Sequence, residues 1–245
     1  MSKNYELLQR VSTTGHFPLS VETASHSRIA PAPLGQRRVA ADPEIGKLVQ
    51  RLFSAAGQDN GPKVVSFSGI ARDDRSSWIC ARAAEILSEQ AGSSVCVVDA
   101  NLVAPQLHVE LAAASHPGFA DALITKEPIR NYATPISGEH LWLIPAGHAK
   151  PGFRPSRERY RERMAELREA FEYILVGAPS LARETEATLF GQLADGAVLI
   201  VEANRTRRET LRRAKEQLQS AHVTLLGAVL DQRTFPIPEK LYHRL

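Results

Sequence analysis

The chain has 245 residues, 43% of them apolar and 6% aromatic, and carries a formal net charge of +3. This length allows one domain with a full core, or one domain plus an arm, and the low aromatic content suits a layered α/β protein better than an all-β one. The small positive excess is compatible with acidic partners, phosphates or an anionic membrane surface, and is too small to demand nucleic acid. No apolar run approaches the ~20 residues that cross a membrane, and no signal-peptide core lies near the first residue, so the sequence predicts a soluble, cytoplasmic protein.

The first part of the chain divides into an arm and a helix. Residues 1–40 mix Ser, Thr, Pro and Gly without an apolar period, which predicts a disordered or mobile arm. Residues 41–245 are expected to form a single α/β domain. It begins with a helix that Asp42 is expected to cap, just before Pro43. The apolar residues predicted to share one face of this helix are Ile45, Leu48, Val49, Leu52 and Phe53.

After residue 61, short apolar runs alternate with amphipathic stretches. The predicted strands are residues 64–68, 95–100, 141–146, 173–178, 197–203 and 224–230, and the predicted helices lie near 76–90, 157–171, 182–193 and 206–220. Strands that are nearly all apolar and alternate with helices form mainly parallel sheets covered on both faces. We therefore predict a three-layer, doubly wound, mainly parallel α/β fold. Its ligand is expected at the carboxyl edge of the strands, in the loops after Ser68, Val98 and Val176.

The first of these loops has the spacing of a phosphate-binding loop. Residues 69–76 read GIARDDRS, where the motif reads GxxxxGK followed by Ser or Thr. Gly69 opens the loop and Ser76 closes it, and Ser77 follows in the predicted helix. Backbone N–H groups and the start of a helix can therefore still face a phosphate, and the Ser76 hydroxyl can still bind magnesium.

Two residues that the motif requires are replaced. Asp74 stands at the second Gly, where its carboxylate would face phosphate at a cost of about 4 kcal/mol for a close pair of like charges. Arg75 stands at the position of the motif's Lys and keeps its positive charge, and its guanidinium can form two hydrogen bonds with a phosphate. Its planar guanidinium is nevertheless longer than an ammonium and is no direct substitute for it. Arg72 offers a second cation.

The second and third loops carry a single acid between them. Asp99 ends a predicted buried strand, where it could bind magnesium, abstract a proton, or simply cap the next turn. Asn101 lies two residues further on and lacks the charge that a hard cation prefers. The third loop has Gly177 where a phosphate-loop NTPase carries an Asp for the metal. These substitutions indicate a damaged site.

Taken together, these motifs resemble the bacterial tyrosine autokinases of capsule and exopolysaccharide synthesis, a branch of the deviant P-loop ATPases that is related to partition and cell-division-site ATPases. The similarity runs from about Asp42 to the last residue. The stretches that match the family's motifs, in the family's order, are residues 64–87, 99–105, 118–123, 141–147, 171–181, 193–211 and 225–245. A single match of this kind is weak, whereas seven in order predict a P-loop NTPase-like fold.

The resemblance implies ATP and Mg2+ as cofactors and a C-terminal tyrosine as phosphoacceptor, which here leaves Tyr242. A tyrosine packed on the domain's edge is the competing interpretation of Tyr242. It also implies docking on the cytoplasmic tail of a membrane-embedded chain-length regulator (a polysaccharide co-polymerase), at the inner face of the membrane, and it leaves a homo-oligomer open. The residues it assigns to nucleotide binding are Gly69, Arg72, Asp74, Arg75, Ser76, Ser77 and Asp231, with Ser76 and Asp99 for the metal and Asp99 and Arg75 as catalytic residues.

The leading hypothesis is a tyrosine-kinase-like, regulatory component of exopolysaccharide synthesis whose ATP site is impaired, in other words a pseudokinase. An active magnesium-ATP autokinase is the first alternative. The second is a partition-type ATPase that binds DNA or a membrane surface through the arginines of residues 205–213. DNA is disfavoured because phosphate contacts alone need several cations clustered on one surface.

Overall fold

The computed structural model describes residues 21–24, 43–53, 61–71, 75–150, 152–182 and 185–232. Their core is one eight-stranded sheet in the order β1-β8-β7-β2-β6-β3-β5-β4. Neighbouring strands are parallel except for β4 and β5, so the predicted doubly wound, mainly parallel sheet is confirmed. The strands are β1 (Val21–Ala24), β2 (Val64–Gly69), β3 (Val95–Asp99), β4 (Thr134–Ser137), β5 (Leu141–Ile144), β6 (Tyr173–Gly177), β7 (Gly196–Glu202) and β8 (Leu225–Asp231).

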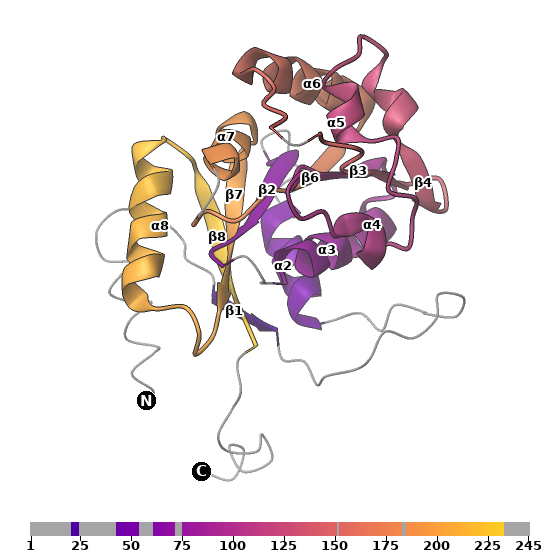
Figure 1. The fold of residues 1–245 in the computed structure, drawn as a ribbon. Coiled ribbons are helices and arrows are strands. Elements are labelled where there is room, and N and C mark those ends of the chain that lie inside the picture. Colours follow the sequence, from indigo (N-terminus) through magenta and orange to yellow (C-terminus); the bar gives the residue numbers. More distant parts are fainter. Residues whose placement is uncertain are drawn as a thin grey trace.

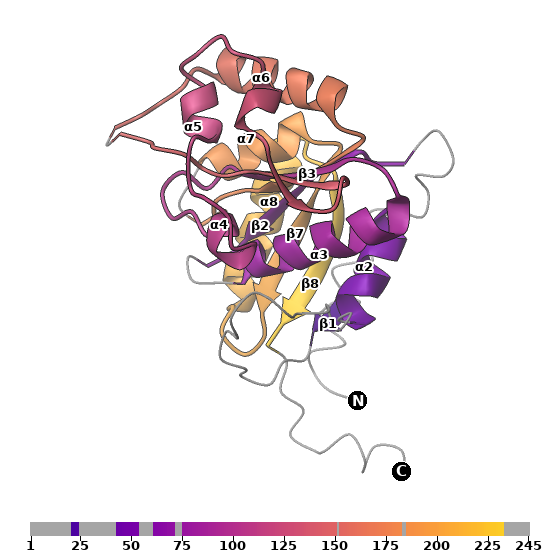
Figure 2. The ribbon, with the colours of Figure 1, turned by 90° about the vertical axis from the view of Figure 1, so that its right-hand side faces the viewer.

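Helices cover both faces of the sheet, which gives the three predicted layers (Figures 1 and 2). One face carries α2 (Pro43–Phe53), α3 (Ser76–Ala91) and α4 (Leu107–Glu110). The other carries α5 (Phe119–Ala122), the 3-10 helix η2 (Ile129–Tyr132), α6 (Arg157–Ala170), α7 (Thr185–Leu193) and α8 (Arg208–Ser220). None of the helices in the described ranges is long and apolar enough to pass through a bilayer.

The alternation of side chains along each strand explains why the central strands are apolar throughout. In β2, Val65 and Phe67 pack with α2 and α3, whereas Val64 packs with α6 and α7 on the opposite face. All six residues of β2 are buried, as expected for a strand that has helices on both sides. The five apolar residues predicted to share one face of α2 are all buried as well.

Some elements were not predicted, and all of them are short. They are β1, β4, α4, α5 and η2, each of four residues. Four residues cover about one helical turn or two repeats of a strand, too few for a hydrophobic period to stand out. β1 lies within the predicted arm, residues 1–40, and pairs with β8; the rest of that range is outside the described residues.

Candidate functional site

The carboxyl ends of β2, β3 and β6 meet at one edge of the sheet, as predicted for the three loops. β6 lies between the other two strands, and Gly177 at its end is in register with both Phe67 of β2 and Asp99 of β3. The Gly69 carbonyl, at the end of β2, accepts a hydrogen bond from the N–H of Leu181 in the loop after β6, with N···O 3.0 Å. The third loop therefore lies beside the first, and the N–H of Ala100 in the second loop donates to the Gly177 carbonyl at the start of the third, with N···O 2.9 Å.

Helix α3 starts directly after the first loop and directs the positive end of its dipole toward that loop. It is 16 residues long, has no acidic residue in its first turn, and its N-cap residue, Arg75, makes no capping hydrogen bond through its side chain. Ser76 and Ser77, its first two residues, are half-buried. A helix start whose N-cap residue supplies no capping side chain attracts anions. Arg72 and Asp74 lie outside the described residues, so their predicted roles stay predictions.

Arg75 contacts one residue of the same helix, Trp78, and one distant in the sequence, Asp231. Its Nη1 lies 3.3 Å from Oδ1 of Asp231, the last residue of β8, and its Cζ lies 3.9 Å from the ring centroid of Trp78. The Asp231 side chain is 1% exposed and that of Arg75 25% exposed. The structure thus brings together two predicted nucleotide-binding residues as an ion pair, with the guanidinium stacked on an indole.

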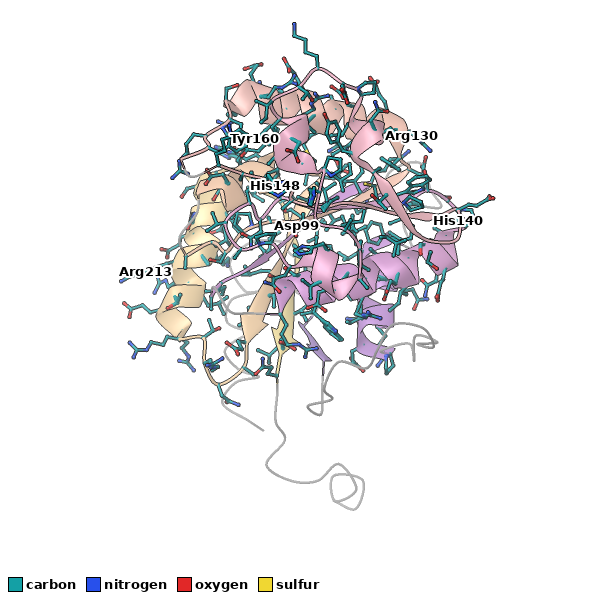
Figure 3. All side chains as sticks on the ribbon, turned by 45° about the vertical axis from the view of Figure 1, so that its right-hand side comes forward. Asp99, Arg130, His140, His148, Tyr160 and Arg213 are labelled. Atoms are coloured by element: carbon teal, nitrogen blue, oxygen red, sulfur yellow. The ribbon has the colours of Figure 1, made fainter. Side chains whose placement is uncertain are left out.

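Asp99 is completely buried, and its carboxylate is occupied by backbone N–H groups. Oδ1 accepts a hydrogen bond from Asn101, and Oδ2 accepts hydrogen bonds from Gln106 and Leu107, at N···O distances of 3.0 to 3.2 Å. Burial raises the pKa of Asp99 to about 6, and the three hydrogen bonds act to lower it. Figure 3 shows Asp99 between the layers, whereas Arg213 projects outward from α8. The carboxylate therefore holds the start of α4, which is the capping role that the sequence left open.

Gly177 occupies the position of the third-loop acid, and an apolar side chain covers it. A Cβ atom added at Gly177 would lie 2.7 Å from Cδ1 and 3.4 Å from Cγ of Leu107, the first residue of α4. Leu107 is completely buried, so it has little freedom to move aside. Asp99 fixes the N–H of Leu107 while the side chain of Leu107 fills the space beside Gly177. α4 therefore occupies the place where a metal ligand was expected.

The residues in the described ranges do not fit a magnesium ion in this arrangement. Magnesium is usually bound through one or two carboxylates together with waters and phosphate oxygens. Both oxygens of Asp99 already accept N–H groups, and the carboxylates that end β7 and β8, Glu202 and Asp231, form ion pairs with Arg205 and Arg75. Among the described residues, no group of three or more His, Cys, Asp or Glu side chains could hold a metal ion. The assignment of Ser76 and Asp99 as metal ligands stays a prediction.

Sequence analysis did not identify Trp78 or Leu107 as site residues. Trp78 is three residues after Arg75, and residues three apart share a helix face, so this contact could have been found from the spacing. The contact between Leu107 and Gly177 joins two segments 70 positions apart, and no local pattern predicts it. Tyr242, the predicted phosphoacceptor, lies outside the described residues.

Comparison with known proteins was made for sequence and for structure. No family model matches the chain. The tyrosine-protein kinase YwqD of Bacillus subtilis is 25% identical over 178 residues, which cover 72% of this chain and 75% of that protein. The succinoglycan biosynthesis transport protein ExoP of Rhizobium meliloti is 27% identical over 175 residues, which cover 69% of this chain and 22% of that protein.

Solved structures with the same fold include a chimeric protein, a tyrosine kinase domain and a cell-division complex. The chimeric protein CapA2B2 has a TM-score of 0.77 at 17% identity, covering 93% of this chain and all of that chain. The kinase domain of the Escherichia coli tyrosine kinase ETK has a TM-score of 0.76 at 17% identity, covering 97% and 98%. The MinC:MinD cell division complex of Aquifex aeolicus has a TM-score of 0.60 at 19% identity, covering 74% and 72%.

Proposed function

We propose, from a confirmed resemblance to bacterial tyrosine-protein kinases with the deviant P-loop ATPase fold, that this chain is a regulatory, kinase-like component of exopolysaccharide or capsule synthesis. In this proposal it binds ligands and partners at its ancestral nucleotide site without efficient ATP turnover. The chain, with an arm of residues 1–40 and a domain of residues 41–245, would then act as a cytoplasmic adaptor at the membrane.

The proposal depends on one observation: Asp99 and Gly177 hold α4 in place at the edge of the sheet. The one acid predicted for the metal accepts three backbone hydrogen bonds instead, and the position of the missing acid is packed by Leu107. Phosphoryl transfer depends on positioning and on cations that neutralise the developing charge. A site that holds a divalent ion poorly loses that stabilisation, while the start of α3 and Arg75 can still bind an anion.

The partner in this proposal is a membrane-embedded co-polymerase with a cytoplasmic tail. The similarity to ExoP, named for succinoglycan transport, and to the CapA2B2 chimera supports a partner of this class. The partition-type alternative gains less support. Arg212 and Arg213 of α8 are exposed, but each pairs with an acid of the same helix, Glu216 and Glu209, which reduces the charge available to an anionic polymer.

Incubation of the full chain with labelled ATP, with and without magnesium, tests the proposal. We expect no phosphotyrosine above background, and calorimetry should give an ATP affinity that magnesium does not raise. Asp99→Ala should leave that affinity unchanged, although it destabilises the fold. Magnesium-dependent phosphotyrosine that Tyr242→Phe abolishes would instead establish the active-kinase alternative, with Arg75 and Ser76 holding phosphate and Asp99 acting on the metal.

A further inference from the structure

His116 and His148 bring two imidazole rings together at the surface of the protein. His116 lies in the loop before α5, and His148 lies in the loop after β5. Their ring centroids are 4.4 Å apart, and the ring planes are inclined at 58°. Both residues are exposed, so solvent and dissolved ions can reach the rings.

Hydrogen bonds hold together the two loops that carry these rings. The Gly147 N–H donates to the Ser115 carbonyl, with N···O 3.2 Å. The Oδ2 atom of Asp121 accepts one hydrogen bond from each loop, from the N–H of Gly118 at 2.8 Å and from that of His148 at 3.4 Å. The backbone positions of the two histidines are therefore fixed relative to each other before any ligand binds, which lowers the entropic cost of binding.

The ring separation is close to that of two imidazoles bound to one metal ion. A metal-to-nitrogen distance of about 2.0 Å and an angle of about 90–110° between the two bonds place the ring centroids about 4.5–5 Å apart. Nδ1 of His116 lies 3.2 Å from the hydroxyl oxygen of Ser115. In the tautomer whose Nδ1–H donates to that oxygen, Nε2 keeps the lone pair that a metal binds.

Nitrogen ligands determine which ions this pair can take. Imidazole suits Zn2+, Ni2+ and Cu2+, whereas Mg2+ takes oxygen ligands. Two protein ligands leave coordination positions for water, and in the described ranges no group of three or more His, Cys, Asp or Glu side chains could complete the shell. Such a site binds more weakly than a structural zinc site with four protein ligands.

We propose that His116 and His148 together bind a divalent transition-metal ion, with water in the remaining coordination positions. The ion would link the loop before α5 to the loop after β5. This inference goes beyond the proposed function and does not depend on it, because neither histidine is among the residues assigned to nucleotide or magnesium.

Calorimetric titration of the untagged full chain with Zn2+, in a buffer that contains excess Mg2+, tests the inference. The chain should bind Zn2+, and Mg2+ should not displace it. Loss of a residue that only supports a metal ligand typically weakens binding 10- to 100-fold, so His116→Ala and His148→Ala should each weaken Zn2+ binding at least about 10-fold. Ser115→Ala, which removes the partner of Nδ1, should have a smaller effect in the same direction.

His140→Ala is the matched control, because His140 is an exposed histidine in the turn between β4 and β5 (Figure 3). It should leave the Zn2+ affinity unchanged. Electron paramagnetic resonance of bound Cu2+ gives a second readout: a signal with two nitrogen ligands in wild type and in His140→Ala, lost in His148→Ala.

Circular dichroism establishes whether each variant folds. If the histidine variants do not fold, the count of nitrogen ligands around Cu2+ in wild type decides alone. No Zn2+ binding by wild type, an affinity that neither His116→Ala nor His148→Ala changes, or a Cu2+ signal with fewer than two nitrogens overturns the inference.

Discussion

At the scale of single residues, Asp99 shows how a side chain with catalytic chemistry can serve the fold. Its carboxylate is fully buried and accepts hydrogen bonds from three backbone N–H groups. Sequence reasoning placed Asp99 at the correct strand end and named capping as one of its roles. It could not choose among them, because the N–H groups of Gln106 and Leu107 reach the carboxylate only after the chain folds back.

The raised pKa of Asp99 predicts a pH dependence of stability. Because burial raises this pKa from 3.8 to about 6, the native state holds the Asp99 proton more tightly than the unfolded state does. The contribution of Asp99 to the free energy of unfolding is therefore largest below about pH 4 and falls as the pH rises through 6. Asp99→Asn removes this titration, so the stability difference between wild type and variant should narrow by about 2 kcal/mol from pH 4 to pH 7 in urea unfolding.

Asp195 provides a control with the opposite sign. Burial acts to raise the pKa of Asp195, but hydrogen bonds from Arg168 and from the N–H groups of Val64 and Lys63 lower it below its ordinary value. The stability it contributes is present above its ordinary pKa and is lost as the pH falls. The difference between wild type and Asp195→Asn should therefore shrink toward acid. A stability difference for Asp99→Asn that stays constant with pH would contradict the prediction for Asp99.

At the scale of elements, the four-residue helix α4 contacts the ends of two strands that form the candidate site. Its first N–H groups are fixed by Asp99 at the end of β3, and its first side chain packs on Gly177 at the end of β6. α4 therefore links the carboxyl ends of two adjacent parallel strands. Long elements such as α3 were predictable from periodicity, whereas α4 was not, because a single turn has no period and its position depends on contacts with β3 and β6.

A double-mutant cycle tests the packing of Leu107 on Gly177. Gly177→Ala adds a methyl group against Leu107 and should destabilise the protein by about 1–3 kcal/mol, the usual cost of overpacking. Leu107→Ala alone should cost about 2–5 kcal/mol as a cavity. The combined variant should be more stable than the sum predicts, by at least about 0.5 kcal/mol, because each change relieves the other. Strict additivity in denaturant unfolding would show that the two positions do not contact each other.

At the scale of the whole molecule, the departures from the sequence motifs of a phosphate-loop ATPase are distributed over the ends of three strands. The loop after β2 has Asp74 and Arg75, the loop after β3 has Asn101, and β6 ends in Gly177. The order of motifs along the chain was enough to predict the sheet and the edge at which the three loops meet. The resemblance assigned Arg75 and Asp231, 156 positions apart, to one site, but it did not predict the ion pair between them, because the family has other residues at both positions.

Restoring only the first loop should therefore recover little activity. Asp74→Gly together with Arg75→Lys rebuilds the phosphate-loop motif but leaves Gly177 covered by Leu107. We expect ATP affinity to improve, since the motif predicts that the carboxylate of Asp74 would face the phosphates, with no phosphotyrosine above background. Arg75→Lys alone is the matched control for the loss of the guanidinium. Full autokinase activity from the double change would show that activity does not require an acid at position 177.

The antiparallel strand β4 bears on how copies of this protein can associate. It forms one border of the sheet, its register against β5 is irregular, and Pro135 within it has no backbone N–H to donate. Borders with these features resist pairing with a strand from another molecule. Continuation of the sheet from one subunit to the next is disfavoured on that side, so a ring or stack of this protein would have to be joined through its helices or through the opposite margin.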